Sequence, residues 1–348
     1  MAAHQGSVLN RKFREKSRIA VLTLWVGISP LAGATSVNVP QRIPDVYAKP
    51  ATLVTVAHGR QLNLRCTGSG PQTVMLEAGS HADSTTWFKL LPILSPVTKV
   101  CAYDRAGYGF SSEGQLPRDL DADVSDLHDL IHAAGIKTPL VLVGHSLGSN
   151  IVRLYAERYA TDVDGMVLID PPEQDMAAFA PEWAKSDDES SAQRFALIRH
   201  CEASAEKGEL VSPAALKACG VGSNPLASAK LNAVILANKS KPAFWRTLLS
   251  ELQNNAVVFS KPVSPKETHG SMPLIVLTAA NTYTGAPANV RKALEAAREK
   301  TQVQIVASST RGERLLVDNT SHDVQLDQPE VVAKAVTKVL QQAAAADK

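Results

Sequence analysis

The chain has few cysteines, few aromatic residues and no excess of charge of either sign. Of its 348 residues, four are cysteine and 5% are aromatic, and the formal net charge is +2. No two cysteines show the C-x-x-C spacing of a zinc or redox site, so neither a structural metal nor a cofactor is expected. Outside the N-terminal segment, no lysine and arginine block with interleaved aromatic residues occurs, which argues against a nucleic-acid partner. With 45% hydrophobic and 20% charged residues, the composition is that of a globular chain with a sizeable core.

Long hydrophobic runs are also missing, apart from one near the N-terminus. There, a cluster of basic residues precedes an apolar segment over residues 19–31, and the small residues Ala32, Gly33 and Ala34 follow. The segment contains Pro30 and is shorter than the roughly 20 residues that span a bilayer. This pattern is typical of a secretory signal peptide, with a permanent anchor as the weaker alternative. We therefore expect export, to the periplasm or the medium, after cleavage near Ala34.

Export would give the four cysteines a role, because disulfides form in an oxidising compartment. Four cysteines allow three pairings. Proximity in the sequence favours Cys201 with Cys219, and Cys66 pairs with Cys101 if their strands are neighbours. Buried free thiols are the alternative.

Strand-like and helix-like patterns alternate on both sides of a long helical insertion. Alternation of this kind predicts a mostly parallel sheet with helices on both faces. It divides the chain into a signal peptide (1–34), a first core part (35–171), a helical lid (172–269) and a second core part (270–348). Strand-like runs occupy residues 52–56, 61–66, 73–76, 99–103, 140–143, 165–170, 273–277 and 314–317, while residues 301–309 are ambiguous between strand and helix.

The motif G-H-S-L-G at residues 144–148 directly follows one of these apolar runs and precedes a helical pattern. In a strand-turn-helix context, G-x-S-x-G nominates Ser146 as a nucleophile. The two glycines have a mechanical reason, because side chains at their positions would collide in the sharp turn that strains the serine backbone. Ser146 would stand at a helix N-terminus, where unpaired N–H groups favour developing negative charge.

Four motifs, in this order, resemble those of the α/β-hydrolase superfamily over about residues 51–171 and 270–342. The resemblance implies an α/β-hydrolase fold: a mostly parallel eight-stranded sheet with helices on both faces and a helical lid inserted after the sixth strand. The motifs are L-E-A-G-S at 76–80, D-R-A-G-Y-G-F-S at 104–111, G-H-S-L-G at 144–148 and S-H-D at 321–323.

The resemblance assigns roles around Ser146. An alcohol needs a base to lose its proton as it attacks, and His322 lies just beyond the last strand, where the family carries its general base. The backbone N–H groups of Leu147 and Ser80 are implied as the donors that hold a negative oxygen. Ala78 replaces the histidine that usually precedes Gly79, which leaves the backbone donor in place.

The third member of the triad departs from the commoner pattern. Many relatives carry an acid just after the seventh strand, but residues 278–283 contain no Asp or Glu. Some branches place the acid at the end of the sixth strand, where Asp170 stands. We therefore predict that Asp170 orients His322, with Glu173 and Asp175 as the alternative acids. Asn281 could hold the ring by a neutral hydrogen bond but would stabilise the imidazolium poorly.

The other histidines and the Asp-Arg pair at 104–105 have simpler interpretations. His145 occupies the variable position of the motif and is predicted to be a packing residue. His128 and His132 are one helical turn apart, but no third ligand accompanies them in the sequence, so they are interpreted as surface residues. His81 either contacts substrate or faces solvent. The Asp-Arg pair is interpreted as structural.

The predicted activity is cleavage of a small-molecule carboxylic ester through an acyl-enzyme intermediate, without metal or organic cofactor. A serine at the turn argues against epoxide opening and halide removal, which use Asp there in this superfamily. An aminopeptidase or amidase of the same fold is an alternative, since acids at 187–189 could face a substrate amine. A non-catalytic binding protein is a second alternative, supported by the missing acid after the seventh strand. The oligomeric state stays open.

Overall fold

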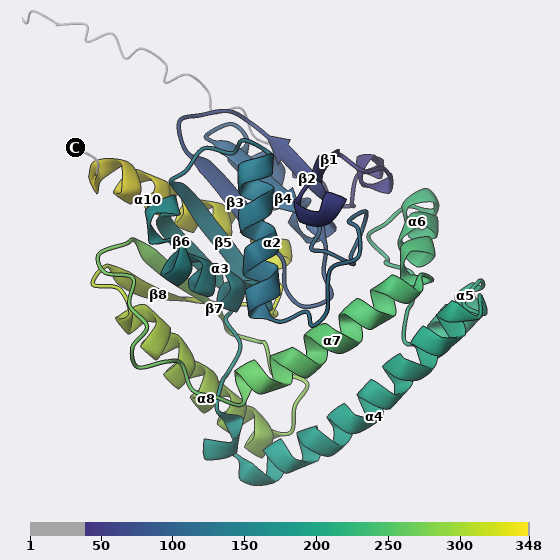
Figure 1. Ribbon diagram of the computed structural model, residues 1–348. Coiled ribbons are helices and arrows are strands. Elements are labelled where there is room, and N and C mark those ends of the chain that lie inside the picture. Colours follow the sequence, from purple (N-terminus) through teal and green to yellow (C-terminus); the bar gives the residue numbers. More distant parts are fainter. Residues whose placement is uncertain (1–38, 347–348) are drawn as a thin grey trace, which may run out of the picture. The chain divides into compact units, whose positions relative to one another are not determined.

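A central sheet organises the part of the chain that the computed structural model describes, residues 39–346; the predicted signal peptide lies outside these residues. The sheet has eight strands in the order β1-β2-β4-β3-β5-β6-β7-β8 (Figure 1). β2 runs antiparallel to β1 and to β4, and all other neighbours are parallel, which confirms the predicted sheet. The strands are β1 (Thr52–Thr55), β2 (Gln61–Thr67), β3 (Thr73–Glu77), β4 (Lys99–Tyr103), β5 (Leu140–His145), β6 (Val163–Ile169), β7 (Leu274–Ala279) and β8 (Gly312–Val317).

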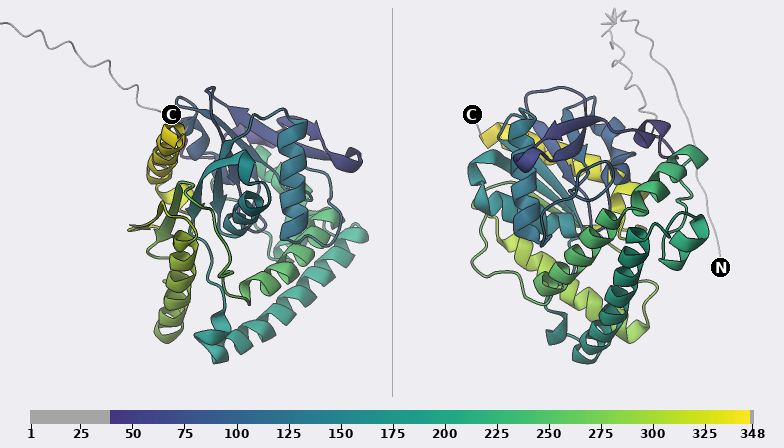
Figure 2. Two further views of the ribbon diagram at one scale, coloured as in Figure 1. Left: turned by 60° about the vertical axis from the view of Figure 1, so that its left-hand side comes forward. Right: turned by 45° about the vertical axis from the view of Figure 1, so that its right-hand side comes forward.

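Helices cover both faces of the sheet because its central strands are apolar on both sides. In β5, Val141 and Val143 pack into the core shared with α1 and α10, whereas Leu140 and Leu142 face the core shared with α2, α3 and α8. Figures 1 and 2 show these helices on the two faces of the sheet. The helices are α1 (Leu90–Leu94), α2 (Leu120–Ala133), α3 (Leu147–Arg158), α4 (Pro181–Glu206), α5 (Pro213–Ala218), α6 (Ala229–Lys239), α7 (Pro242–Phe259), α8 (Ala288–Ala307), α9 (Val324–Asp327) and α10 (Pro329–Ala346), with 3-10 turns η1 (Asp45–Ala48), η2 (Ala57–Gly59), η3 (Ser84–Trp87), η4 (Ala160–Asp162) and η5 (Met176–Ala178).

The predicted helical lid is present between β6 and β7 and consists of α4 to α7. Its two long helices, α4 and α7, lie side by side outside the sheet (Figures 1 and 2). Phe244 and Trp245 of α7 and Ile198 of α4 belong to a separate apolar core of the lid. The lid is therefore a packed unit with its own buried side chains.

Two disulfides confirm the pairing that was favoured from the sequence. Cys201 of α4 is bonded to Cys219, which follows α5, and the bond closes a segment of the lid. Cys66 of β2 is bonded to Cys101 of β4, and the two residues face each other in the register of these strands. Both bonds support an oxidising environment for the folded protein.

The ends of helices and strands differ in places from the sequence prediction. The ambiguous residues 301–309 are mostly helical, because α8 continues to Ala307 and buries Ile305 against the sheet. The predicted strand at 165–170 begins earlier, at Val163, and ends at Ile169. Within residues 39–346, none of the helices combines the length and the apolar character that crossing a bilayer would need.

Candidate active site

The turn between β5 and α3 holds Ser146 in a strained conformation. Its backbone angles are φ 53° and ψ −122°, a conformation that residues other than glycine rarely adopt. The glycines on either side are needed for space: a Cβ on Gly144 would lie 2.5 Å from the Gly148 carbonyl oxygen, and one on Gly148 would lie 2.4 Å from that of Glu77. The Ser146 N–H donates to the Ile169 carbonyl at 2.9 Å, so the turn is fixed against the end of β6.

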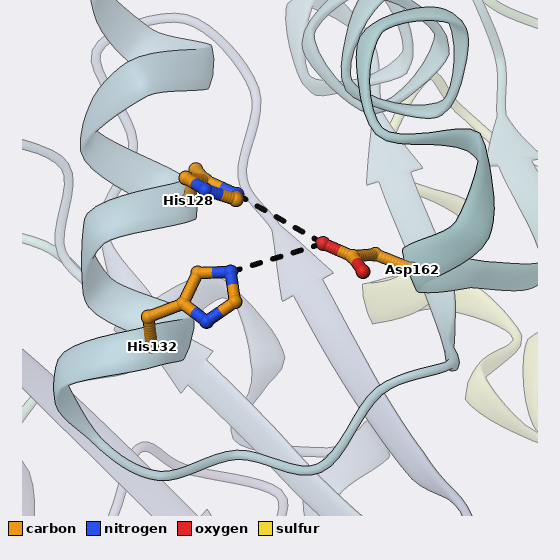
Figure 3. Close-up of side chains that lie close together, drawn as sticks. All are labelled: His128, His132 and Asp162. Atoms are coloured by element: carbon orange, nitrogen blue, oxygen red, sulfur yellow. Dashed lines mark ion pairs between the residues drawn. The ribbon is translucent and has the colours of Figure 1, made fainter.

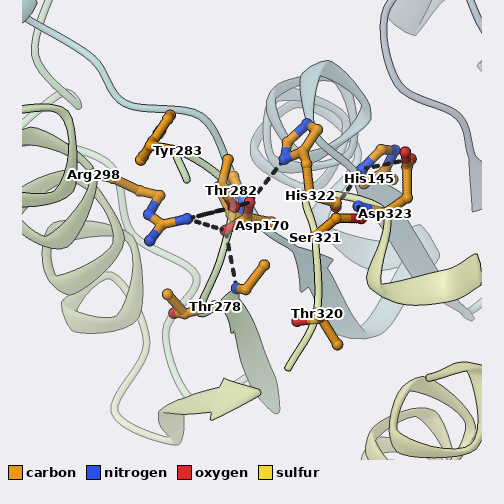
Figure 4. Close-up of polar contacts among 12 residues, drawn as sticks. His145, Asp170, Thr278, Thr282, Tyr283, Arg298, Thr320, Ser321, His322 and Asp323 are labelled. Carbon is orange, nitrogen blue, oxygen red and sulfur yellow. Dashed lines mark hydrogen bonds and ion pairs between the residues drawn. The ribbon is translucent and has the colours of Figure 1, made fainter. Parts of the chain in front are cut away.

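Asp170 and His322 meet beside this turn, although 152 positions separate them in the chain. Asp170 directly follows β6 and is fully buried, while His322 stands in the loop between β8 and α9. The Nδ1 atom of His322 lies 2.7 Å from Oδ2 of Asp170 (Figure 4). A carboxylate at Nδ1 leaves the opposite ring nitrogen, Nε2, as the atom that can exchange protons with a substrate or a nucleophile.

Other donors keep the Asp170 carboxylate ionised. Thr282 donates its hydroxyl at 2.6 Å, the Ala279 N–H donates at 3.2 Å, and the buried Arg298 guanidinium lies at 3.1 Å (Figure 4). Burial raises the pKa of Asp170, but the hydrogen bond from His322, the charge of Arg298 and the Thr282 hydroxyl outweigh it, so that this pKa lies below its ordinary value. A charged acceptor therefore faces the imidazole.

The loop after β7, where many relatives carry the acid, supplies a donor to the acid instead. Thr282 lies in this loop, and Arg298 follows on α8. Neither residue was singled out from the sequence, since a threonine in a loop and an arginine in a helix carry no motif. The one sequence feature that set this loop apart was the absence of any Asp or Glu over residues 278–283.

The two alternative acids have other partners. The Glu173 carboxylate accepts a hydrogen bond from the Tyr283 hydroxyl, and burial raises the pKa of Glu173 above its ordinary value. Asp175 has a left-handed backbone, with φ 59°, and opens η5. Among residues 39–346, Asp170 is the carboxylate that hydrogen-bonds to the imidazole of His322.

His145 connects the turn to the His322 loop. It is buried, and its Nε2 lies 3.0 Å from the His322 carbonyl oxygen, with the two ring centroids 4.7 Å apart. Burial, with the charge of His322, lowers the pKa of His145 to about 4, so its ring is neutral at pH 7. The residue predicted to pack also holds the His322 backbone beside Ser146. No direct hydrogen bond between Ser146 and the His322 ring is formed within the described part of the chain; in unliganded active sites this bond is often long and tightens with substrate.

The loop after β3 packs directly on the turn that carries Ser146. A Cβ on Gly79 would lie 2.9 Å from Nδ1 of His145 and 3.3 Å from Cβ of Ser146, so only glycine allows this approach. Over residues 39–346, neither the Ser80 N–H nor the Leu147 N–H has a hydrogen-bond acceptor. Two backbone donors near Ser146 are thus free to bind an anionic oxygen.

Arg105 holds the backbone of this loop through hydrogen bonds. Its guanidinium is buried and donates to the carbonyl oxygens of Ala78 at 2.6 Å and Gly79 at 2.7 Å. It also forms ion pairs with Glu77 at 2.8 Å and Glu251 at 2.9 Å. The sequence interpretation of the Asp-Arg pair as structural agrees with these contacts, which fix the backbone that leads to the Ser80 N–H.

Glu251 is a functional candidate that the sequence did not reveal. It lies on α7 of the lid, is buried, and accepts hydrogen bonds from the Ser80 hydroxyl at 2.5 Å and from the His81 N–H at 2.8 Å. The His81 side chain lines a small cavity of about 60 Å³ next to α6. The lid therefore contacts the loop after β3 through a charged side chain.

Glu251→Gln is expected to lower the free energy of unfolding by about 3 kcal/mol, because it removes one charge of a buried ion pair and leaves Arg105 undercompensated. Glu77 compensates only partly, since burial raises its pKa to about 7 despite the nearby Arg105 charge. Urea unfolding followed by circular dichroism measures the change. The control Glu209→Gln, at an exposed position of the lid, should stay within about 0.5 kcal/mol of the parent. Coincident curves for the two variants would contradict the role of this pair.

A cavity of about 440 Å³ opens between the lid and the loop after β3, and neither Ser146 nor His322 is among the residues that line it. Ser80 lines it from the core, Pro172 and Glu173 line it from the segment that follows β6, and Phe195, Leu252 and Asn255 line it from the lid helices. The lining combines apolar surface with a few polar groups, as is usual for small-molecule sites. Among the described residues, the one group of three metal-ligating side chains lies elsewhere, on α2 and η4.

Comparisons with known proteins agree with this architecture. Residues 56–335 match the model of the Alpha/beta hydrolase family. An uncharacterized Bacillus subtilis protein, YqjL, is 38% identical over 112 residues, which are 32% of this chain and 44% of that protein. A second uncharacterized Bacillus subtilis protein, YbdG, is 26% identical over 114 residues, 32% of this chain and 35% of that protein. The chain thus matches less than half the length of these relatives.

Solved structures show the same fold at low sequence identity. A thermophilic esterase from Thermogutta terrifontis has a TM-score of 0.55 at 20% identity, with 84% of this chain and 98% of that chain covered. A meta-cleavage product hydrolase from Pseudomonas fluorescens IP01 has a TM-score of 0.57 at 16% identity, with 84% and 98% covered. A likeness at such identity shows the fold alone. Because the family model covers most of the chain and the fold agrees, the chain belongs to the alpha/beta hydrolase family, as its motifs predicted.

Proposed function

We propose that the protein is a serine hydrolase that cleaves a carboxylic ester through an acyl-enzyme intermediate. The observation that carries the proposal is the 2.7 Å contact between His322 Nδ1 and the ionised Asp170, placed beside the strained turn of Ser146. A hydrolase follows from the family; the ester, the serine nucleophile and the triad are inferred from this geometry.

The proposed mechanism assigns one group to each step. The Ser146 hydroxyl oxygen attacks the ester carbonyl carbon while His322 Nε2 takes its proton, and Asp170 stabilises the imidazolium that forms. The carbonyl oxygen becomes negative and accepts hydrogen bonds from the N–H groups of Ser80 and Leu147. When the tetrahedral intermediate collapses, the carbon–oxygen bond to the alcohol breaks and His322 returns the proton to the leaving oxygen. Water then attacks the acyl group by the same route and frees Ser146.

The contact between Asp170 and His322 counts against a non-catalytic binding protein. That alternative relied on the missing acid after the seventh strand. Asp170, directly after the sixth strand, provides a carboxylate for His322 instead. The cavity under the lid offers room for a small-molecule substrate. The two disulfides support the proposal that the protein acts after export.

The pH dependence of kcat/KM should report the protonation of His322. Burial lowers the pKa of His322, but the hydrogen bond and the charge of Asp170, with Asp323 and Glu173, outweigh it and raise this pKa above 6.5. The base acts only when neutral, so activity should be lost as the pH falls through this raised pKa. In Asp170→Asn, the residual activity should fall at a lower pH, because the charge that raised the pKa is gone. An acid limb at the same pH in both proteins would contradict this assignment.

A fluorophosphonate probe tests the proposed nucleophile. The protein should form one covalent adduct, and peptide mass spectrometry should locate it on Ser146. Paired ester and amide substrates with the same acyl group then distinguish an esterase from an amidase or aminopeptidase. A protein that neither reacts with the probe nor hydrolyses short-chain acyl esters would contradict the proposal and favour a binding protein.

A further inference from the structure

A second cluster of reactive side chains lies at the opposite edge of the sheet, beside the start of β6. His128 and His132 are one turn apart on α2, and both rings point toward Asp162 at the end of η4 (Figure 3). The sequence interpretation of the two histidines as surface residues found no third ligand for them, whereas the structure brings the Asp162 carboxylate beside both rings. This carboxylate comes from a separate element, the turn η4 that follows α3.

The distances suit a shared ion. The Asp162 Oδ2 atom lies 3.9 Å from Nδ1 of His128 and 3.8 Å from Nε2 of His132. One ligand atom from each of the three residues lies within 4.8 Å of the other two. A tetrahedral zinc ion, with bonds of about 2.0–2.2 Å, holds its ligands about 3.3 Å apart. Small side-chain rotations would close the remaining gap.

Neighbouring aromatic residues already orient two of the three side chains. The Tyr155 hydroxyl is within 3.4 Å of both Asp162 Oδ2 and His128 Nδ1. The ring of Tyr159 stacks on that of His128, with centroids 3.8 Å apart and planes 6° from parallel. Packing of this kind holds a ligating ring in the binding geometry. The Tyr155 hydroxyl contacts the same Nδ1 and Oδ2 atoms, so it would turn away from them when the ion binds.

We propose that His128, His132 and Asp162 form a zinc site with three protein ligands. Imidazole nitrogen and carboxylate oxygen are both established ligands of this ion, and a water molecule would complete the tetrahedron. Just over half of the His132 side chain is exposed, at 54%, which gives the ion a path from solvent. The bound ion would join the C-terminal half of α2 to the turn that follows α3, the helix that begins beside Ser146.

Zinc binding can be measured without reference to catalysis. The protein, without a polyhistidine tag, is titrated with zinc in competition with a chromophoric chelator, and its Tm is recorded with and without the ion. We expect one equivalent of zinc to bind and the Tm to rise, because the ion binds the folded state. His132→Ala and Asp162→Asn should each weaken binding by about 100-fold or more, since loss of a ligand exceeds the effect of losing a supporting residue.

Two controls make the outcome decisive. His200→Ala removes an exposed histidine from α4 and should bind zinc as the parent does. Unfolding curves of all the variants in the presence of a chelator establish that each is folded. Parent protein that binds no zinc, or an Asp162→Asn variant that binds it as tightly as the parent, would overturn the proposed site, and neither result would affect the proposed ester hydrolysis.

Discussion

Ser146→Ala is expected to lower kcat for ester hydrolysis by about a million-fold, leaving only what the oxyanion donors and substrate binding contribute. The reason is chemical: without the hydroxyl, no acyl-enzyme forms and the neighbouring imidazole has no proton to take. The backbone at this position is already strained in the parent, at φ 53°, and alanine adds no further bulk. The folded structure should therefore survive.

The measurement compares initial rates on a short-chain chromogenic ester for the two proteins. Ser69→Ala, an exposed serine in the loop between β2 and β3, is the matched control and should retain the parental rate. Retention of more than about a hundredth of the parental kcat in Ser146→Ala would mean that another group is the nucleophile.

Asp170→Asn is expected to lower kcat by about ten thousand-fold. The asparagine amide can present an N–H to Nδ1 of His322, which favours the tautomer that carries its proton on Nε2 and so cannot accept one from Ser146. The neutral amide also fails to stabilise the imidazolium. KM should change little, because Asp170 is fully buried and does not line the cavity under the lid.

The variant also tests the choice among the three acids. Asp175→Asn should keep nearly the parental kcat, since asparagine tolerates the left-handed backbone there and Asp175 does not contact His322. Asp170→Asn should also be less stable, because Arg298 loses the charge of its buried partner. Rates are therefore compared at a temperature where circular dichroism shows both variants folded. A near-normal kcat in Asp170→Asn would move the role to another residue.

The features that the sequence predicted are those with a local pattern or a fixed place in the order of strands. The turn at Ser146 combines an apolar run, two glycines and a helix within a few residues. Asp170 and His322 follow the ends of β6 and β8, and the carboxyl ends of parallel strands meet at one edge of a sheet. Knowing the order of strands was therefore enough to expect these side chains near each other.

The residues that escaped prediction act through contacts between elements that are distant in the sequence. Glu251 is one of many charged residues in the lid, and nothing near it in the sequence indicates that α7 will bury it against Arg105. Asp162 follows His132 by thirty residues, in a turn with no metal-binding motif. Such pairings depend on how helices pack on the sheet, and periodicity alone does not determine this.

Through Glu251, the insertion between β6 and β7 supports the loop after β3 in addition to covering the proposed active site. Its carboxylate accepts a hydrogen bond from the hydroxyl of Ser80, the residue whose backbone N–H is proposed to bind the negative oxygen of the intermediate. Grafting the corresponding insertion of a relative onto this core would exchange that support together with the walls of the cavity. Turnover number and substrate preference should then change together, and variation in this segment among homologous enzymes would tune both at once.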